Sequence, residues 1–112
     1  MAAEYGESVS PPTAAPLTGI TVLEVGTFIA APFAAMHLAD LGARVIKVED
    51  PAGGDTVRAA GPFLGGESSA FIRLNRNKQD LALDLKAADG AAVFRRLAGG
   101  ADVLIENLRP GD

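Results

Sequence analysis

The hydrophobic pattern of the first half of the chain predicts a strand, a helix and a second strand. Residues 20–25 form a mostly apolar, β-branched run between two glycines, which is typical of a buried parallel strand. A helix is expected to have Pro32 in its first turn and to run to about Leu41, with Gly42 as a left-handed cap. Residues 44–49 predict the next strand, which completes one βαβ unit.

The second half of the chain repeats this order after a long interruption. Residues 50–74 are rich in glycine and proline, and we expect a loop without regular structure, a kind of segment that is often functional. Residues 81–85 alternate as in a strand, residues 87–98 carry a helical apolar stripe, and residues 102–106 predict a last strand. The sequence therefore predicts an α/β fold with a parallel sheet built from two βαβ units.

The domain organisation follows from the same pattern. Residues 1–15 have no periodicity and contain two adjacent prolines, so we expect a flexible leader without function. Four strands and two helices do not cover both faces of a parallel sheet, as such sheets require. We therefore expect residues 16–112 to be the front of a longer protein. A short chain that oligomerises heavily remains the alternative.

Composition excludes several kinds of function. The chain has 112 residues with 10 Lys and Arg against 14 Asp and Glu, a net charge of −4 that disfavours nucleic-acid binding. It has no cysteine, so disulfides, thiol nucleophiles and Cys-ligated zinc are excluded. The single histidine, His37, does not predict a metal site or a catalytic base. The first residues do not have the basic start and apolar run that are typical of a signal peptide, and no apolar run reaches membrane length, so we expect a cytoplasmic protein without metal.

The loop after the first predicted strand is a candidate binding site. A strand, Gly26 and a helix N-terminus form a suitable scaffold for a phosphate, but the dinucleotide fingerprint needs three glycines. Phe28 and Ile29 lie where the backbone would have to approach a pyrophosphate. We therefore do not expect NAD binding, and these side chains suit an apolar or aromatic ligand group better.

Polar residues at other strand ends extend the candidate site. Asp84, Glu106 and Asn107 lie at or near strand ends, and ligands of open α/β sheets bind at the carboxyl ends of strands. Lys86 precedes a predicted helix, where a cation opposes the helix dipole. It either meets an anionic ligand or is simply solvated, and the residues alone leave both possibilities open.

Five segments in register resemble the N-terminus of the family III CoA-transferases, a group that includes formyl-CoA and succinyl-CoA transferases and α-methylacyl-CoA racemase. The segments are residues 16–24, 39–49, 75–78, 83–86 and 101–111. The resemblance implies a Rossmann-like large domain, an interlocked homodimer and coenzyme A bound as acyl-CoA, with a carboxylic acid as the second substrate. In the transferases an Asp carboxylate forms a mixed anhydride and then an aspartyl-CoA thioester. In the racemases a His and an Asp move the proton next to the thioester.

The resemblance also implies which residues contact CoA, and it places the catalytic groups beyond residue 112. No catalytic residue is therefore expected here, and residues 1–112 alone should be inactive. The residues that match CoA-contacting positions of the family are Phe28, Ile29, Leu83, Lys86, Asn107 and Leu108. Lys86 is expected to pair with a phosphate. Transferases often have a basic residue where this chain has Asp50, so that contact is either absent or supplied by Arg58.

The branch of the family is set by the segment between the two units. Residues 65–71 and 75–78 look like the transferases, whereas racemases tend to have a shorter stretch there. We therefore expect a CoA-transferase. The alternatives are a racemase fragment and a binding or interaction module that kept the sheet and lost the chemistry.

Overall fold

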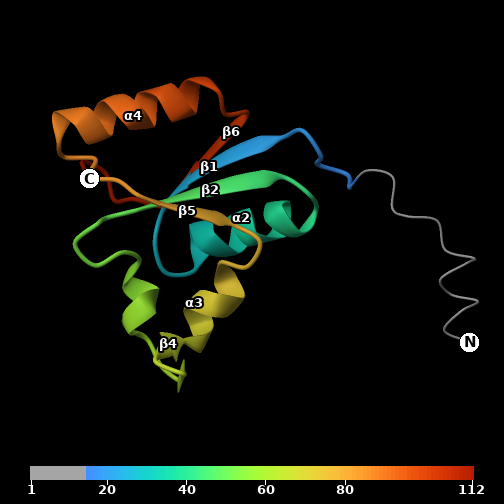
Figure 1. The fold of residues 1–112 in the computed structure, drawn as a ribbon, viewed down its shortest axis with the longest axis vertical. Coiled ribbons are helices and arrows are strands. Elements are labelled where there is room, and N and C mark those ends of the chain that lie inside the picture. The colour runs from blue at the N-terminus through green and yellow to red at the C-terminus, as the bar shows by residue number, and fades with distance from the viewer. Residues whose placement is uncertain (1–14) are drawn as a thin grey trace, which may run out of the picture.

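The computed structural model describes residues 15–112 and shows a four-stranded parallel sheet between two helices (Figure 1). The strand order is β5-β2-β1-β6. The strands are β1 (Thr21–Val25), β2 (Arg44–Glu49), β5 (Gln79–Ala82) and β6 (Val103–Glu106). The predicted α/β class and parallel sheet are confirmed. Apart from Ala15, the leader expected over residues 1–15 lies outside the described residues.

The two central strands are buried on both faces, which explains their nearly continuous apolar sequence. Val22 of β1 is paired with Val45 of β2, and the two are 0% and 1% exposed. These two side chains point to one face of the sheet. Their neighbours Leu23 and Ile46 point to the other face and belong to a second core cluster.

Helix α2 (Ala30–Asp40) covers the face that carries Val22 and Val45 (Figure 1). Ala35 and Ala39 meet these valines, and such small side chains let the helix approach the sheet closely. The predicted helix ends are confirmed to within two residues. Pro32 lies in the first turn, and Gly42 follows the helix with a φ of 103°.

Helix α4 (Ala88–Gly99) lies over the opposite face, where Phe94 and Leu97 pack against the second cluster (Figure 1). It connects β5 and β6, which occupy opposite edges of the sheet. The second βαβ unit therefore joins two edge strands across the first unit and does not form a neighbouring pair. The longest helix of residues 15–112 has 12 residues, and none is long and apolar enough to cross a membrane.

The segment expected to be an unstructured loop, residues 50–74, contains regular elements. They are the 3₁₀ helix η1 (Thr56–Ala59), the hairpin of β3 (Phe63–Leu64) and β4 (Glu67–Ser68), and helix α3 (Ser69–Leu74). The expectation was wrong because polar side chains cap two short helices within this segment. The Asp55 side chain accepts a hydrogen bond from the Val57 amide, and Ser68 accepts one from the Phe71 amide.

The strand expected over residues 81–85 lies two to three residues earlier, as β5. Its pairing with β2 continues through one bond, from the Leu83 amide to the Glu49 carbonyl. It ends there because the Asp84 side chain accepts a hydrogen bond from the Lys86 amide at 3.0 Å, which forms a local turn. The alternation of Leu81, Leu83 and Leu85 continued past the end of the strand and made the predicted strand begin and end too late.

Candidate functional site at the carboxyl edge of the sheet

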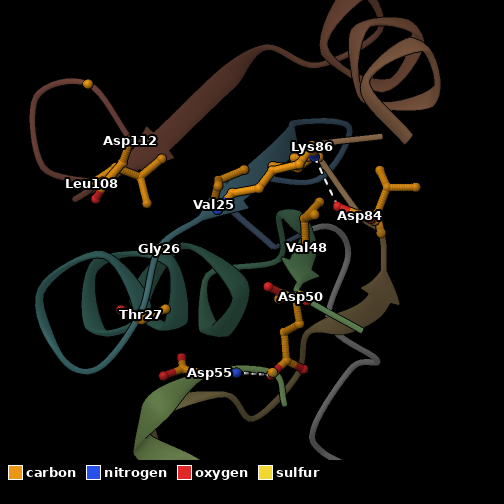
Figure 2. A pocket seen from close by; sticks show the side chains of 15 residues that line it. Val25, Gly26, Thr27, Val48, Asp50, Asp55, Asp84, Lys86, Leu108 and Asp112 are labelled. Atoms are coloured by element: carbon orange, nitrogen blue, oxygen red, sulfur yellow. Dashed lines mark hydrogen bonds between the residues drawn. The ribbon is translucent and has the colours of Figure 1, made fainter. Parts of the chain in front are cut away.

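A cleft of about 500 Å³ opens at the carboxyl ends of the strands (Figure 2). Val25 and Gly26 come from the end of β1, and Val48 comes from the end of β2. The segments that follow β5 and β6 supply Lys86 and Leu108. This is the edge where open parallel sheets bind their ligands.

Lys86 is the only lysine or arginine that lines this cleft in the described part of the chain. Its backbone amide is held by Asp84, and α4 begins two residues later. Figure 2 shows the Lys86 side chain extending along the cleft beside Val25. The site therefore offers one exposed positive charge beside apolar side chains, and five carboxylates line it as well: Glu49, Asp50, Asp55, Asp84 and Asp112.

The structure brings Leu83, Lys86 and Leu108 together in this cleft. Phe28 and Ile29 line a separate, neighbouring cavity of about 570 Å³ between α2, η1 and α3. Both side chains are about half exposed. Whether they contact the same ligand stays a prediction.

Asn107, the remaining predicted site residue, holds the loop after β1. Its Oδ1 accepts a hydrogen bond from the Thr27 amide at 3.1 Å, and its Nδ2 donates to the Thr27 carbonyl at 2.9 Å. Gly26 is required for this approach, because a Cβ there would lie 2.4 Å from Asn107 Oδ1 and 2.7 Å from the Ala31 Cβ. Asn107 thus shapes the wall of the cleft through the backbone.

Arg58, one of the two alternatives for the phosphate contact that Asp50 cannot make, lies outside the residues that line the cleft and is held by carboxylates. Its guanidinium donates to both carboxylate oxygens of Glu49, at 2.8 and 2.7 Å, and to Asp80 at 3.0 Å. It also stacks 3.7 Å from the centre of the Phe71 ring. These contacts leave Arg58 outside the residues that line the cleft.

The carboxylates around Arg58 have strongly shifted pKa values. Burial alone would raise the pKa of Glu49, but the hydrogen bonds from Arg58 outweigh it and lower the pKa to about 2. Burial, followed by the hydrogen bond and charge of Glu49, raises the pKa of Asp80 to about 6. The pKa of Glu49 is therefore lowered from its ordinary value, and the pKa of Asp80 is raised.

A buried network of charges lies beneath the loop after β1, and sequence reasoning missed it. Lys47 Nζ lies 2.6 Å from Glu24 Oε2 and 2.8 Å from Asp55 Oδ2, although the latter contact is an ion pair without an aligned hydrogen bond. Lys78 Nζ lies 2.6 Å from Glu24 Oε1 and also donates to the Asn75 side chain. The sequence did contain a sign of this network, because Glu24 and Lys47 are charged residues within otherwise apolar strands.

These contacts leave Lys78 unavailable to a ligand phosphate. Its side chain is 2% exposed, and its third donor bonds the Pro32 carbonyl at 2.8 Å. His37 has no catalytic partner in the described residues and packs edge-on against Phe33, with ring centres 4.4 Å apart. Residues 15–112 contain no cluster of three His, Asp or Glu side chains that could hold a metal ion.

Comparison with known proteins identifies the family. Residues 17–112 match the family model described as CoA-transferase family III. The chain belongs to CoA-transferase family III. The resemblance stated from the sequence is thus confirmed, and it covers the whole cleft.

The relatives and a solved structure agree with this assignment. The chain is 45% identical over 97 residues to human succinyl-CoA:glutarate CoA-transferase, covering 86% of this chain and 22% of that protein. It is 46% identical over 100 residues to the succinyl-CoA–L-malate CoA-transferase beta subunit of Chloroflexus aurantiacus, covering 88% and 25%. A CAIB/BAIF family protein from Brucella suis superposes with a TM-score of 0.81 at 38% identity, covering 88% and 27%. The chain therefore spans about a quarter of the length of these proteins.

Proposed function

We propose that this chain forms the CoA-binding front of an enzyme that moves CoA between an acyl-CoA and a carboxylic acid. The observation that carries the proposal is the position of Lys86 at the carboxyl edge of the sheet, in a cleft with Leu83 and Leu108. A single ammonium beside apolar side chains suits a ligand that has both phosphates and an uncharged body. CoA is such a ligand, and charge-assisted bonds to phosphate are among the stronger hydrogen bonds.

The remaining charges in the cleft restrict where the phosphates can lie. Five carboxylates also line it. Those of Glu49, Asp55 and Asp112 are paired with Arg58, Lys47 and Arg109, whereas Asp50 and Asp84 have no ion pair within the described residues and would repel a phosphate. The phosphate that Lys86 binds is therefore expected to lie on the side of Lys86 away from Asp50 and Asp84. Leu83 and Leu108 would then contact the uncharged part of the ligand.

The proposed transfer uses an Asp carboxylate supplied by residues beyond this chain. That carboxylate attacks the acyl carbonyl of the donor and releases CoA thiolate, which leaves a mixed anhydride. The thiolate then attacks the aspartyl carbonyl, giving an aspartyl-CoA thioester and releasing the donor acid. The acceptor carboxylate reverses both steps, so that the new acyl-CoA forms and the Asp carboxylate is regenerated.

The names of the human and Chloroflexus relatives support a transferase over a racemase. The experiment is to mix the full natural protein with succinyl-CoA and a panel of carboxylic acids, and to follow new acyl-CoA species by chromatography. Transfer to at least one acid is expected, with borohydride trapping the thioester on an Asp. Loss of label from the α-carbon of a branched acyl-CoA without CoA transfer would instead indicate a racemase, and neither reaction would favour a binding module.

We also propose that the full protein is a homodimer in the cytoplasm. The exposed apolar side chains of Phe63 and Leu64, 56% and 72% exposed at the tip of the β3–β4 hairpin, support a surface covered by another part of the assembly. The word "subunit" in the name of the Chloroflexus relative also supports an oligomer. Light scattering of the full natural protein tests this, and a monomeric mass would contradict it.

A further inference from the structure

The loop that forms one wall of the cleft has a backbone conformation that needs support. Phe28 has a φ of 69°, in the left-handed region that residues with a Cβ rarely occupy. Its side chain is 50% exposed, so packing holds it only in part. The hydrogen bonds made by the loop backbone must supply the rest of the constraint.

Two side chains from distant parts of the chain make these bonds. Asn107 binds both backbone groups of Thr27, as described above. Asp55 Oδ1 accepts a hydrogen bond from the Phe28 amide at 2.9 Å. Asp55 comes from the segment after β2, so two segments hold successive residues of the same loop.

Asp55 is itself fixed in place. It is 2% exposed, its Oδ1 also accepts from the Val57 amide, and its backbone amide donates to Glu49 Oε1 at 2.7 Å. Its other oxygen lies 2.8 Å from Lys47 Nζ, and that ammonium also lies 3.4 Å from the Gly26 carbonyl. Asp55 thus binds the Phe28 amide, and Lys47 binds the Gly26 carbonyl of the same loop.

We propose that Asp55, supported by Lys47, is a positioning residue that sets the Gly26–Phe28 wall of the CoA cleft. This inference rests on the proposed function. Gly26 and Thr27 line the cleft directly, so a shift of this loop changes the shape that the ligand meets. Small displacements of positioning groups can weaken an enzyme–ligand complex strongly.

The test compares Asp55→Ser with Asp55→Asn in the full natural protein. Asparagine keeps an oxygen that can accept from both the Phe28 and Val57 amides. Serine keeps only a cap for the Val57 amide, because it is a good N-cap residue with a shorter side chain. Both variants remove the charge opposite Lys47. Asparagine also places its Nδ2 donor where Asp55 Oδ2 lies 2.8 Å from Lys47 Nζ, so hydrogen exchange of the Phe28 amide is measured beside the affinity to show that the bond to the loop is kept.

We expect CoA to bind Asp55→Ser about three- to tenfold more weakly than Asp55→Asn, the effect of losing one neutral hydrogen bond. The Phe28 amide should also exchange its hydrogen faster in the serine variant. Val45→Ala is the matched control, since Val45 is buried under α2 away from the loop and should reduce stability without changing the CoA Kd. Equal CoA affinities in the two variants, with the Phe28 amide protected in the Asn variant and not in the Ser variant, would overturn the proposal, as would equal exchange of that amide in the two.

Hydrogen exchange on the unmodified protein keeps the proposal testable if a variant does not fold. The Phe28 amide should be protected without ligand, although its side chain is half exposed. An unprotected amide would overturn the positioning role. Failure of the unmodified protein to bind CoA would contradict the proposed function instead, and the exchange measurement would still decide whether Asp55 holds the loop.

Discussion

Lys47 and Glu24 face each other across the paired strands β2 and β1, with Lys47 Nζ 2.6 Å from Glu24 Oε2 and both side chains buried. Asp55 and Lys78 complete the network, so that two ammonium groups face two carboxylates. Burial alone would lower the pKa of Lys47, but Asp55 and Glu24 outweigh it and raise the pKa. In formal charges, the two lysines balance the two carboxylic acids beneath the loop that borders the cleft.

Removing one charge from this buried network is expected to lower the stability of the fold. Lys47→Met should lower the free energy of unfolding by about 3–5 kcal/mol, because the carboxylates of Glu24 and Asp55 lose a buried counter-charge. Urea denaturation of the full natural protein measures the effect. Arg44→Met on the same strand is the control, since Arg44 is exposed and should change stability by less than about 1 kcal/mol. Equal changes in the free energy of unfolding for the two substitutions would contradict a stabilising role of the buried Lys47 charge.

The raised pKa of Asp80 predicts a pH dependence of stability. The folded protein keeps the Asp80 proton up to about pH 6, whereas the unfolded chain loses it near the ordinary pKa of 3.8. The folded state therefore binds more protons in this window, and stability should fall as the pH rises from about 4 to 6. The loss should stay below about 1 kcal/mol, because the side chain is 45% exposed and screened by solvent.

Asp80→Asn tests the origin of that pH dependence. The variant should remove the fall between about pH 4 and 6, measured by thermal melting in buffers of constant ionic strength. Glu49 acts at lower pH, since its pKa of about 2 means that its contribution is lost only as the pH drops from about 4.5 towards 2. If Asp80→Asn keeps the original profile between pH 4 and 6, Asp80 is not the titrating group.

Gly26→Ala should disturb both the fold and the cleft. The added Cβ would lie 2.4 Å from Asn107 Oδ1 and 2.7 Å from the Ala31 Cβ, so Asn107 would have to give up its bonds to Thr27. We expect a loss of about 1–3 kcal/mol, the usual cost of overpacking. Gly53→Ala is the control, because no atom lies within 4 Å of the Cβ it would add. Equal melting temperatures for both variants would contradict the tight approach at Gly26.

The central part of the fold could be predicted because its physical signal is local. The runs at 20–25 and 44–49 are buried on both faces, and the glycine after α2 marks its end. The positions of β5 and α3 could not be predicted in the same way. Single hydrogen bonds that the Asp84 and Ser68 side chains accept from backbone amides set where these elements begin or end, and short polar caps are weak signals in one sequence.

The site was predicted in part for a related reason. Lys86 and Leu108 follow strand ends, and topology alone brings strand ends to one edge. The contact of Asp55 with the Phe28 amide spans 27 residues and depends on how residues 50–59 fold back over β2. Glu24 and Lys47 did show a pattern, two opposite charges within apolar strands, but their pairing requires the register of β1 and β2.

Removing the Lys86 charge tests whether the cleft binds a phosphate of CoA. Lys86→Ala should weaken CoA binding by about 1–2 kcal/mol, roughly tenfold, because one charge-assisted contact to a phosphate is lost. The loss should shrink at high salt, since Lys86 is exposed. Arg95→Ala is the matched control, because it removes one positive charge from the exposed part of α4 outside the cleft.

The most direct measurement is a calorimetric titration of CoA into the full natural protein and its Lys86→Ala and Arg95→Ala variants at low salt. We predict that the unmodified protein and Arg95→Ala bind CoA with the same Kd, and that Lys86→Ala binds roughly tenfold more weakly. Identical Kd values in all three proteins would contradict the account, because Lys86 would then be a solvated lysine and the cleft would not be the site of the phosphates.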